Sequence, residues 1–289
     1  MLPVRLLAAL AAGFVSHSAL AQCRVDALDA FPERAQVHLP TMLPSGPMPL
    51  VILLHGSNGS GADILRNSHL AETADRHGFI VAAPNGAITV ARGYAWNIPG
   101  VPTVSGTLPA KDARDDVAYL TGLVRRLVAT GCVDDKRVYA TGLSGGGRMA
   151  SWLGCVVPRR FAAIAPVVGL RAGRPLASDP TRVDPATCHA ATPLPVLAFS
   201  GDNDTTNPIT GGGASYWQYP QTAALQRWAA MNGCTGPYVR DIDASSYEQG
   251  YARCRGDATV AARILRGGQH SWAVVDNEAM WAFLSRYRR

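Results

Sequence analysis

Short apolar runs recur along the chain and are bounded by glycine, proline or polar residues. A half-exposed strand would alternate apolar and polar side chains, so continuous runs of this length favour strands that are covered on both faces. We predict strands over the segments Leu50–Leu54, Phe79–Ala83, Arg137–Thr141, Ala162–Val168, Val196–Ser200 and Val260–Leu265.

Between these runs, apolar residues recur at the spacing of a helix. The clearest stripe lies within Asp112–Thr130 and consists of Val117, Leu120, Leu123, Val124 and Leu127. Such a stripe faces a core. Strands that alternate with helices form β-α-β units, so we predict an α/β fold with a mostly parallel central sheet and helices on both faces. The predicted helices are Ala62–His77, Asp112–Thr130, Gly146–Cys155, Gln221–Asn232 and Asp276–Tyr287.

The N-terminal 21 residues differ from the rest of the chain. Arg5 supplies a positive start, Leu6–Val15 is apolar, and Ala19-Leu20-Ala21 fits a cleavage site for a signal peptidase. This pattern is typical of a cleaved secretory signal peptide. We therefore expect residues 1–21 to be removed and residues 22–289 to be exported, to the periplasm or the medium. No repeat or linker divides the segment 22–289, which favours a single domain.

Charge and hydropathy exclude some partners. The 289 residues carry a formal charge of +6, but their arginines are scattered, whereas nucleic-acid binding usually needs a concentrated basic face. No segment after the leader is apolar for long enough to span a bilayer. We expect neither nucleic-acid binding nor stable membrane insertion.

The cysteine pattern indicates disulfide bonds. An even number of cysteines in an exported chain favours disulfides, and six cysteines allow 15 full pairings. Chain neighbourhood suggests the pairs Cys155–Cys188, Cys234–Cys254 and, by elimination, Cys23–Cys132. No C-x-x-C or H-E-x-x-H motif is present, so no metal site is indicated.

A candidate nucleophile lies between a predicted strand and a predicted helix. The segment reads Gly142-Leu143-Ser144-Gly145-Gly146, a G-x-S-x-G motif. A sharp strand-to-helix turn holds such a serine above the sheet edge, and its neighbours are glycines because larger side chains would clash. The other interpretation is a glycine-rich turn with an idle serine. We predict that Ser144 is a catalytic nucleophile.

A serine nucleophile needs a base and an acid that orients the base. His270 follows the last predicted strand, which is where hydrolases of the order Ser, acid, His carry their base. The acid is expected after strand Val196–Ser200, where Asp202 and Asp204 both qualify. Asp204 lies further into the loop and is better placed to turn toward His270, whereas Asp202 suits a turn cap.

The oxyanion of an ester intermediate needs two backbone N–H donors. One donor is expected from Gly145, directly after the nucleophile. The other is expected from Ser57, in the loop after strand Leu50–Leu54. Trp96 and Trp272 fall in predicted loops above the strand ends, where an aromatic face suits a substrate ring. Plain packing is the alternative for both tryptophans.

The ordered motifs resemble those of the secreted poly(3-hydroxybutyrate) depolymerase and feruloyl esterase family, within the α/β-hydrolase superfamily. The matching pieces span residues 50–275 and are Leu54-His55-Gly56, Trp96-Asn97, Asp115-Asp116-Val117, Gly142 to Gly146, Gly201 to Asp204 and Gly267 to Trp272. The resemblance implies an α/β-hydrolase catalytic domain, secretion, disulfides and no cofactor. It places the acid on Asp204.

The resemblance implies a serine carboxylic ester hydrolase that works through an acyl-enzyme. The substrates it implies are feruloyl or acetyl esters of plant polysaccharide, or hydroxyalkanoate oligomers. Departures from the family pattern at Ser57, Ser200, Gln269 and Ala273-Val274 bear on the substrate rather than on the core chemistry. The competing hypothesis is a catalytically silent binding protein for aromatic esters or glycans.

Overall fold

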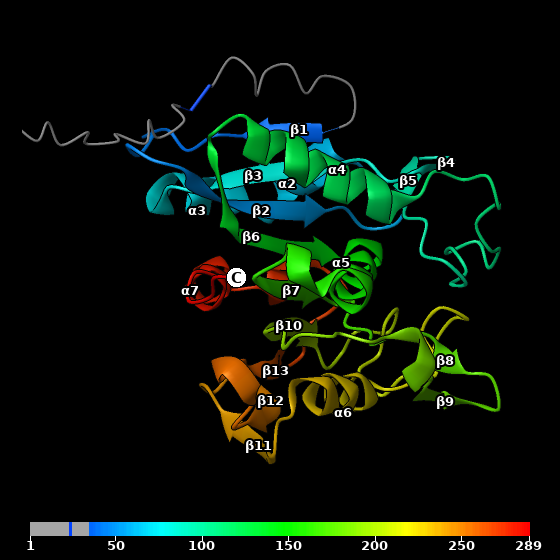
Figure 1. Cartoon of the computed structure of the whole chain (residues 1–289). Helices are drawn as coiled ribbons and strands as arrows, with labels where there is room; N and C mark the ends of the chain where they lie inside the picture. The colour runs from blue at the N-terminus through cyan, green and yellow to red at the C-terminus, as the bar shows by residue number, and fades with distance from the viewer. Residues whose placement is uncertain (1–22, 25–34) are drawn as a thin grey trace, which may run out of the picture.

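A computed structural model describes residues 23–24 and 35–289. The predicted leader, residues 1–21, lies outside the described residues. A nine-stranded sheet forms the centre of the molecule, and Figure 1 shows its strands stacked from β1 at the top to β11 at the bottom. In spatial order the strands are β1 (Ala35–His38), β3 (Ile80–Pro84), β2 (Met48–Leu54), β6 (Val133–Leu143), β7 (Ala163–Val167), β10 (Val196–Gly201), β13 (Val260–Leu265), β12 (Ser246–Ala252) and β11 (Gly236–Asp241).

The six strands from β3 to β13 pair in parallel. They are the six strands that the apolar runs predict, and their bounds differ from the prediction by a few residues at most ends. The mostly parallel sheet is thereby confirmed. Antiparallel strands close both edges of the sheet, with β1 beside β3 and the β12–β11 hairpin beside β13.

Two hydrophobic clusters cover the two faces of the sheet. Along β2, Leu50, Ile52 and Leu54 belong to the first cluster, whereas Val51 and Leu53 belong to the second. This alternation follows from the pleat of a strand, and it explains why a doubly covered strand reads as a continuous apolar run.

Among the described residues, three helices contribute to each cluster. The first cluster packs against α4 (Asp116–Ala129), α5 (Gly145–Val156) and α6 (Gln221–Asn232), and the second packs against α2 (Gly61–Ser68), α3 (Leu70–His77) and α7 (Asn277–Leu284). Helices on both faces of the sheet confirm that part of the prediction (Figure 1).

The predicted single helix Ala62–His77 is wrong. The chain forms two helices there, α2 and α3, because His69 adopts a left-handed conformation with φ 54° and ends the first helix. Only a few per cent of residues other than glycine have positive φ, so a histidine inside an amphipathic pattern gives no sign of a break.

Two other helices are shorter than predicted. Helix α4 begins at Asp116 because the side chain of Asp115 accepts hydrogen bonds from the N–H groups of Val117 and Ala118. Helix α7 begins at Asn277, capped in the same way by Asp276. A side-chain cap of this kind fixes where a helix begins.

The sequence analysis does not predict the polar edge strands or the small two-stranded ribbons. In β11 most side chains are exposed or half-buried, so its sequence lacks an apolar run. The same holds for two short ribbons, which pair β4 (Ile88–Val90) with β5 (Gly93–Ala95) and β8 (Pro175–Leu176) with β9 (Asp179–Val183).

Three disulfides link the described cysteines. The pairs are Cys23–Cys132, Cys155–Cys188 and Cys234–Cys254, the same pairing that chain neighbourhood suggests. The first bridge spans 109 residues and ties the start of the described chain to the turn before β6. In the part of the chain that the structure describes, no helix has the length and apolarity to cross a membrane.

Candidate active site

Ser144 occupies a strained turn between β6 and α5. Its φ of 53° and ψ of −108° lie outside the regions that L-residues usually adopt, and strain of this kind clusters at functional sites. The turn is held by two backbone hydrogen bonds: the N–H of Ser144 donates to Val167 at 2.8 Å, and the N–H of Arg148 donates to the carbonyl of Ser144 at 2.9 Å. The turn sets Ser144 at the carboxyl edge of the sheet, where ligands of such sheets bind.

Close packing against β2 explains two of the glycines around Ser144. A side chain on Gly142 or Gly146 would collide with the carbonyl oxygen of Leu54. The backbone of β2 thus passes directly beside the turn, which only glycine permits. A Cβ placed on Gly56, in the loop after β2, would lie 3.8 Å from the Cβ of Ser144. This loop therefore borders the candidate nucleophile.

His270 and Asp204 are joined by a hydrogen bond of 2.7 Å between Nδ1 and Oδ2. An ionised carboxylate can only accept, so Nδ1 carries the proton and Nε2 is left as the basic nitrogen. The other carboxylate oxygen of Asp204 accepts from the backbone N–H groups of Thr206 and Asn207, each at 2.8 Å. These bonds fix the carboxylate and, through it, the imidazole.

Asp204 is buried but keeps its charge. Burial alone raises the pKa of its carboxyl, but the hydrogen bonds from His270, Asn207 and Thr206 outweigh burial, and the pKa lies below its ordinary value. A buried carboxylate that stays ionised beside an imidazole can stabilise the imidazolium that forms when the base takes a proton.

Asp202 has a different place from Asp204. It is exposed, and its carboxylate accepts from the backbone N–H of Gly267 at 2.6 Å. This bond joins the loop after β10 to the loop after β13, and Asn203 adds a second link by donating to the carbonyl of Gly268 at 3.0 Å. Asp202 thus holds two loops together, which is the capping role that its place in the turn suggests.

Hydrogen bonds connect the acid loop to the serine turn. The side-chain amide of Asn207 donates to the carbonyl of Val168 at 2.6 Å, next to Val167, which receives the N–H of Ser144. Among the hydrogen bonds of the described residues, none joins Ser144 to His270. Catalytic hydrogen bonds in unliganded enzymes are commonly long and tighten in the substrate complex.

The two candidate oxyanion donors lie side by side. A Cβ placed on Gly145 would lie 3.0 Å from the backbone nitrogen of Ser57 and 2.6 Å from its hydroxyl oxygen. Ser57, Gly145 and Trp96 line one small cavity, together with the side chain of Arg148. The cavity thus joins residues from the β2 loop and from the first turn of α5.

His55 is a structural residue of this loop. Its Nδ1 donates to the carbonyl of Gly56 at 2.7 Å, and its Nε2 accepts the N–H of Gly86 at 3.0 Å. Burial lowers the pKa of His55 to about 4, so the ring is neutral at pH 7. The Trp96 ring stacks on it at 4.7 Å and donates its N–H to the carbonyl of His55 at 2.8 Å.

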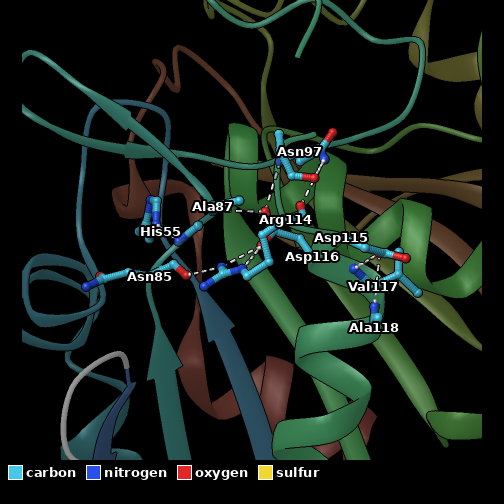
Figure 2. A network of polar contacts seen from close by, with 11 residues as sticks. His55, Asn85, Ala87, Asn97, Arg114, Asp115, Asp116, Val117 and Ala118 are labelled. Atoms are coloured by element: carbon cyan, nitrogen blue, oxygen red, sulfur yellow. Dashed lines mark hydrogen bonds and ion pairs between the residues drawn. The ribbon is translucent and has the colours of Figure 1, made fainter. Parts of the chain in front are cut away.

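A buried network around Asp116 holds the segment that carries Trp96. Figure 2 shows Asp116 between the backbones of Ala87 and Asn97 and the guanidinium of Arg114. One carboxylate oxygen accepts from the two backbone N–H groups at 3.0 and 2.9 Å, and the other pairs with Arg114 at 2.5 Å. Asp116 is fully buried. Its hydrogen bonds fix the backbone at Ala87 and Asn97 against the start of α4, while Asp115 caps the helix.

The two predicted aromatic residues have different surroundings. Trp96 lines the cavity of Ser57 and Gly145. Trp272 packs in the second core cluster and donates its indole N–H to Asn277 at 3.1 Å. Both tryptophans are buried, with 5% of the surface of Trp96 and 8% of that of Trp272 exposed, and Trp96 packs in the first core cluster. A substrate contact stays a prediction for each, and the cavity lining favours Trp96.

Two buried arginines lie near the site, and the sequence analysis does not predict them. Arg148 lies on α5, four residues after Ser144, and Arg171 follows β7 by a few residues. A helical residue four positions on lies on the same face, which is a signal that could have drawn attention to Arg148. Arg171 lies in an irregular segment, where the sequence gives no such signal.

The sheet order, the crossover helices and the serine turn define an α/β-hydrolase. Two of the solved structures that share this fold show the similarity. The acetyl xylan esterase from Aspergillus awamori aligns with a TM-score of 0.61, at 16% identity, over 87% of this chain and 93% of its own. Esterase PE8 aligns with a TM-score of 0.54, at 20% identity, over 87% of this chain and 99% of its own.

The chain belongs to the esterase PHB depolymerase family, whose profile matches residues 35–179. This confirms the resemblance seen in the motifs. Feruloyl esterase B from Piromyces equi is 31% identical over 83% of this chain and 42% of its own length. Poly(3-hydroxybutyrate) depolymerase from Ralstonia pickettii is 33% identical over 46% of this chain and 26% of its own length. The chain thus spans less than half of either relative.

Proposed function

We propose that this protein is a secreted serine ester hydrolase with Ser144 as nucleophile, His270 as base and Asp204 as the orienting acid. The observation that carries the proposal is the 2.7 Å hydrogen bond between Asp204 and His270 at the same sheet edge as the strained turn of Ser144. Family membership supports ester hydrolysis, and the three disulfides support export, because such bonds persist in oxidising compartments.

In the first half of the proposed reaction, the Ser144 hydroxyl oxygen attacks the ester carbonyl carbon while Nε2 of His270 takes the hydroxyl proton. The carbonyl oxygen becomes an oxyanion, which the N–H groups of Ser57 and Gly145 stabilise. Collapse of this intermediate breaks the bond to the alcohol oxygen. His270 returns its proton to that oxygen, and the acyl group stays on Ser144.

In the second half, a water molecule attacks the acyl carbon as His270 takes one of its protons. The bond to Ser144 then breaks, His270 reprotonates the serine oxygen, and the carboxylic acid leaves. Trp96 forms one wall of the cavity and presents apolar surface to the substrate. The substrates we propose are feruloyl or acetyl esters of plant polysaccharide, or hydroxyalkanoate oligomers.

The proposal is tested by comparing purified wild-type protein with Ser144→Ala. We expect wild type to turn over p-nitrophenyl butyrate and to be labelled on Ser144 by a fluorophosphonate, and we expect Ser144→Ala to lose both. Undiminished turnover by Ser144→Ala would overturn the assignment of the nucleophile. A folded wild-type protein that neither turns over esters nor accepts the label would instead be the silent binding protein.

A further inference from the structure

Two arginines with no acidic partner are buried near the candidate site, and Arg148 is the one that contacts a candidate oxyanion donor. Arg148 is 5% exposed and Arg171 is 7% exposed. The ion pairs formed by the described residues include neither of them. Buried charges in proteins are normally paired, because an unpaired buried charge is costly. The two guanidinium groups are therefore an exception that calls for an explanation.

Hydrogen bonds leave part of each guanidinium unsatisfied. Arg148 donates to the hydroxyl of Ser57 at 3.3 Å, and Arg171 donates to the carbonyl of Tyr219 at 2.6 Å. The Nε atom of Arg148 and the Nε and Nη2 atoms of Arg171 are buried without a partner. These donors match the planar fork with which arginine binds a carboxylate.

Aromatic rings hold the two side chains in place. The guanidinium of Arg148 lies 4.1 Å from the ring centre of Tyr216. Arg171 lies 3.3 Å from the ring centre of Trp217 and 4.2 Å from that of Tyr219. Stacking on aromatic faces favours a cation, but it uses the face of the guanidinium and leaves the N–H groups at its edge free to donate.

Both arginines keep their charge at neutral pH. Burial lowers the pKa of Arg148 and of Arg171 to about 10 each. The charge of Arg171 also contributes to the lowered pKa of Arg148, so the two cations repel one another. An anion between them would remove this repulsion and supply the missing acceptors.

The two arginines line one cavity that adjoins the candidate oxyanion site. This cavity is bordered by Ile98, Val101 and Pro102 as well as by both arginines. The same three residues and Arg148 also border the cavity that contains Ser57 and Gly145. Arg148 thus lies between the oxyanion donors and Arg171, and a substrate whose ester carbonyl met those donors would extend toward Arg171.

We infer that Arg148 and Arg171 form a carboxylate subsite, so that the preferred substrates are esters that also bear a free carboxylate. This inference rests on the proposed function and narrows its substrates. A linear hydroxyalkanoate oligomer ends in such a carboxylate, whereas an acetyl ester of a neutral sugar does not. The subsite therefore selects the anionic oligomer over neutral esters.

The test compares two substrates that differ in one group, the linear 3-hydroxybutyrate trimer with its free carboxylate and the same trimer with a terminal carboxamide. We expect kcat/KM of the wild type to favour the acid by about tenfold to a hundredfold, the usual effect of a charge-assisted hydrogen bond. Equal kcat/KM for the acid and the amide would overturn the inference while leaving ester hydrolysis intact.

Variants test whether Arg171 causes the preference for the acid trimer. We expect Arg171→Gln to lose the preference for the acid and Arg171→Lys to keep part of it, because lysine retains the charge without the fork. Arg125→Gln removes the same charge from an exposed position on α4 and should keep the full preference. An unchanged preference in Arg171→Gln would overturn the inference. The comparison of the two trimers in wild type decides the matter even if Arg171→Gln fails to fold.

Binding measurements test the carboxylate subsite independently of the proposed hydrolysis. Calorimetry with Ser144→Ala measures the affinity for the acid trimer and the amide trimer without turnover. Tighter binding of the acid supports the subsite even if wild type cleaves neither trimer, in which case the failure lies with the proposed hydrolysis. Equal binding of the two trimers in Ser144→Ala, or no binding of either, would overturn the subsite whatever the activity.

Discussion

Asp204 and His270 lie 66 residues apart in the chain, yet their side chains are joined by a 2.7 Å hydrogen bond that fixes the protonated nitrogen of the imidazole. The carboxylate is itself held by two backbone N–H groups. An amide in its place would accept only through its oxygen and would present an N–H to the ring or to the backbone. The tautomer of His270 therefore depends on the carboxylate of Asp204.

We predict that Asp204→Asn lowers kcat for p-nitrophenyl butyrate by on the order of 10⁴, because the imidazole is then held in the wrong tautomer. The matched control is Asp202→Asn, at an exposed carboxylate two residues away that bonds only the backbone of Gly267 among the described residues. Asp202→Asn should retain most of the activity. The reverse ranking of the two variants would move the acid to Asp202.

The second prediction concerns the close approach of the two candidate oxyanion donors, the backbone N–H groups of Ser57 and Gly145. A Cβ on Gly145 would lie 3.0 Å from the backbone nitrogen of Ser57, so Gly145→Ala should block or separate the donors. Losing one oxyanion donor costs at least about a hundredfold in kcat, and we expect a loss of that order in steady-state assays. Gly122→Ala on α4, where a Cβ meets no atom closer than 3.7 Å, should leave kcat unchanged.

The neighbouring carboxylates Asp115 and Asp116 should differ in their effect on stability. Asp116→Ala removes the ion-pair partner of Arg114, which keeps its hydrogen bond to the carbonyl of Asn85. It also removes the acceptor of the backbone N–H groups of Ala87 and Asn97. Breaking a buried pair in this way costs about 3 kcal/mol or more. Asp115→Ala removes a helix cap, which costs about 1 kcal/mol. Urea unfolding measures both, and equal losses would contradict the structural role of the Asp116 network.

His55 predicts a loss of stability in mild acid. Its pKa is 6.5 in the unfolded chain and about 4 in the folded protein, because burial disfavours the charged ring. As the pH falls from 6.5 to 4, the unfolded chain takes up a proton that the folded protein refuses, so the free energy of unfolding decreases by about 3 kcal/mol.

Denaturant unfolding between pH 7 and pH 4 measures this dependence. His55→Gln cannot take up the proton in either state. We therefore expect the variant to be less stable than wild type at pH 7 and to lose less stability on acidification. Parallel pH profiles for the two proteins would assign the acid sensitivity to other groups.

Most of the central sheet can be predicted from the sequence. A strand that is buried on both faces needs apolar side chains at nearly every position, so it appears in the sequence as a continuous apolar run. The sequence did not predict β11 and β12, since an edge hairpin with polar faces resembles a loop. It also missed the break at His69, where packing rather than residue type sets the backbone.

For the candidate site, Ser144, Asp204 and His270 can be proposed from the sequence because hydrolase chemistry ties residue type to position after a strand. Arg148 and Arg171 were missed for the opposite reason. Arginine is mostly found at the surface, so a sequence gives no reason to expect it in the interior. Only the three-dimensional packing shows that these two are buried without an acidic side chain as ion-pair partner.

The connection between β10 and α6 has two tasks at once. Asp204 lies near its start, and the rings that hold the two arginines, Tyr216, Trp217 and Tyr219, lie near its end. The proposed selectivity and the proposed chemistry therefore depend on one stretch of chain. Insertions or substitutions within this connection that reshape the proposed carboxylate subsite, while leaving Asp204 and its hydrogen bonds in place, would change the preferred substrate and keep the proposed triad. Changes near its start would disturb Asp204 and, under the proposed mechanism, turnover itself.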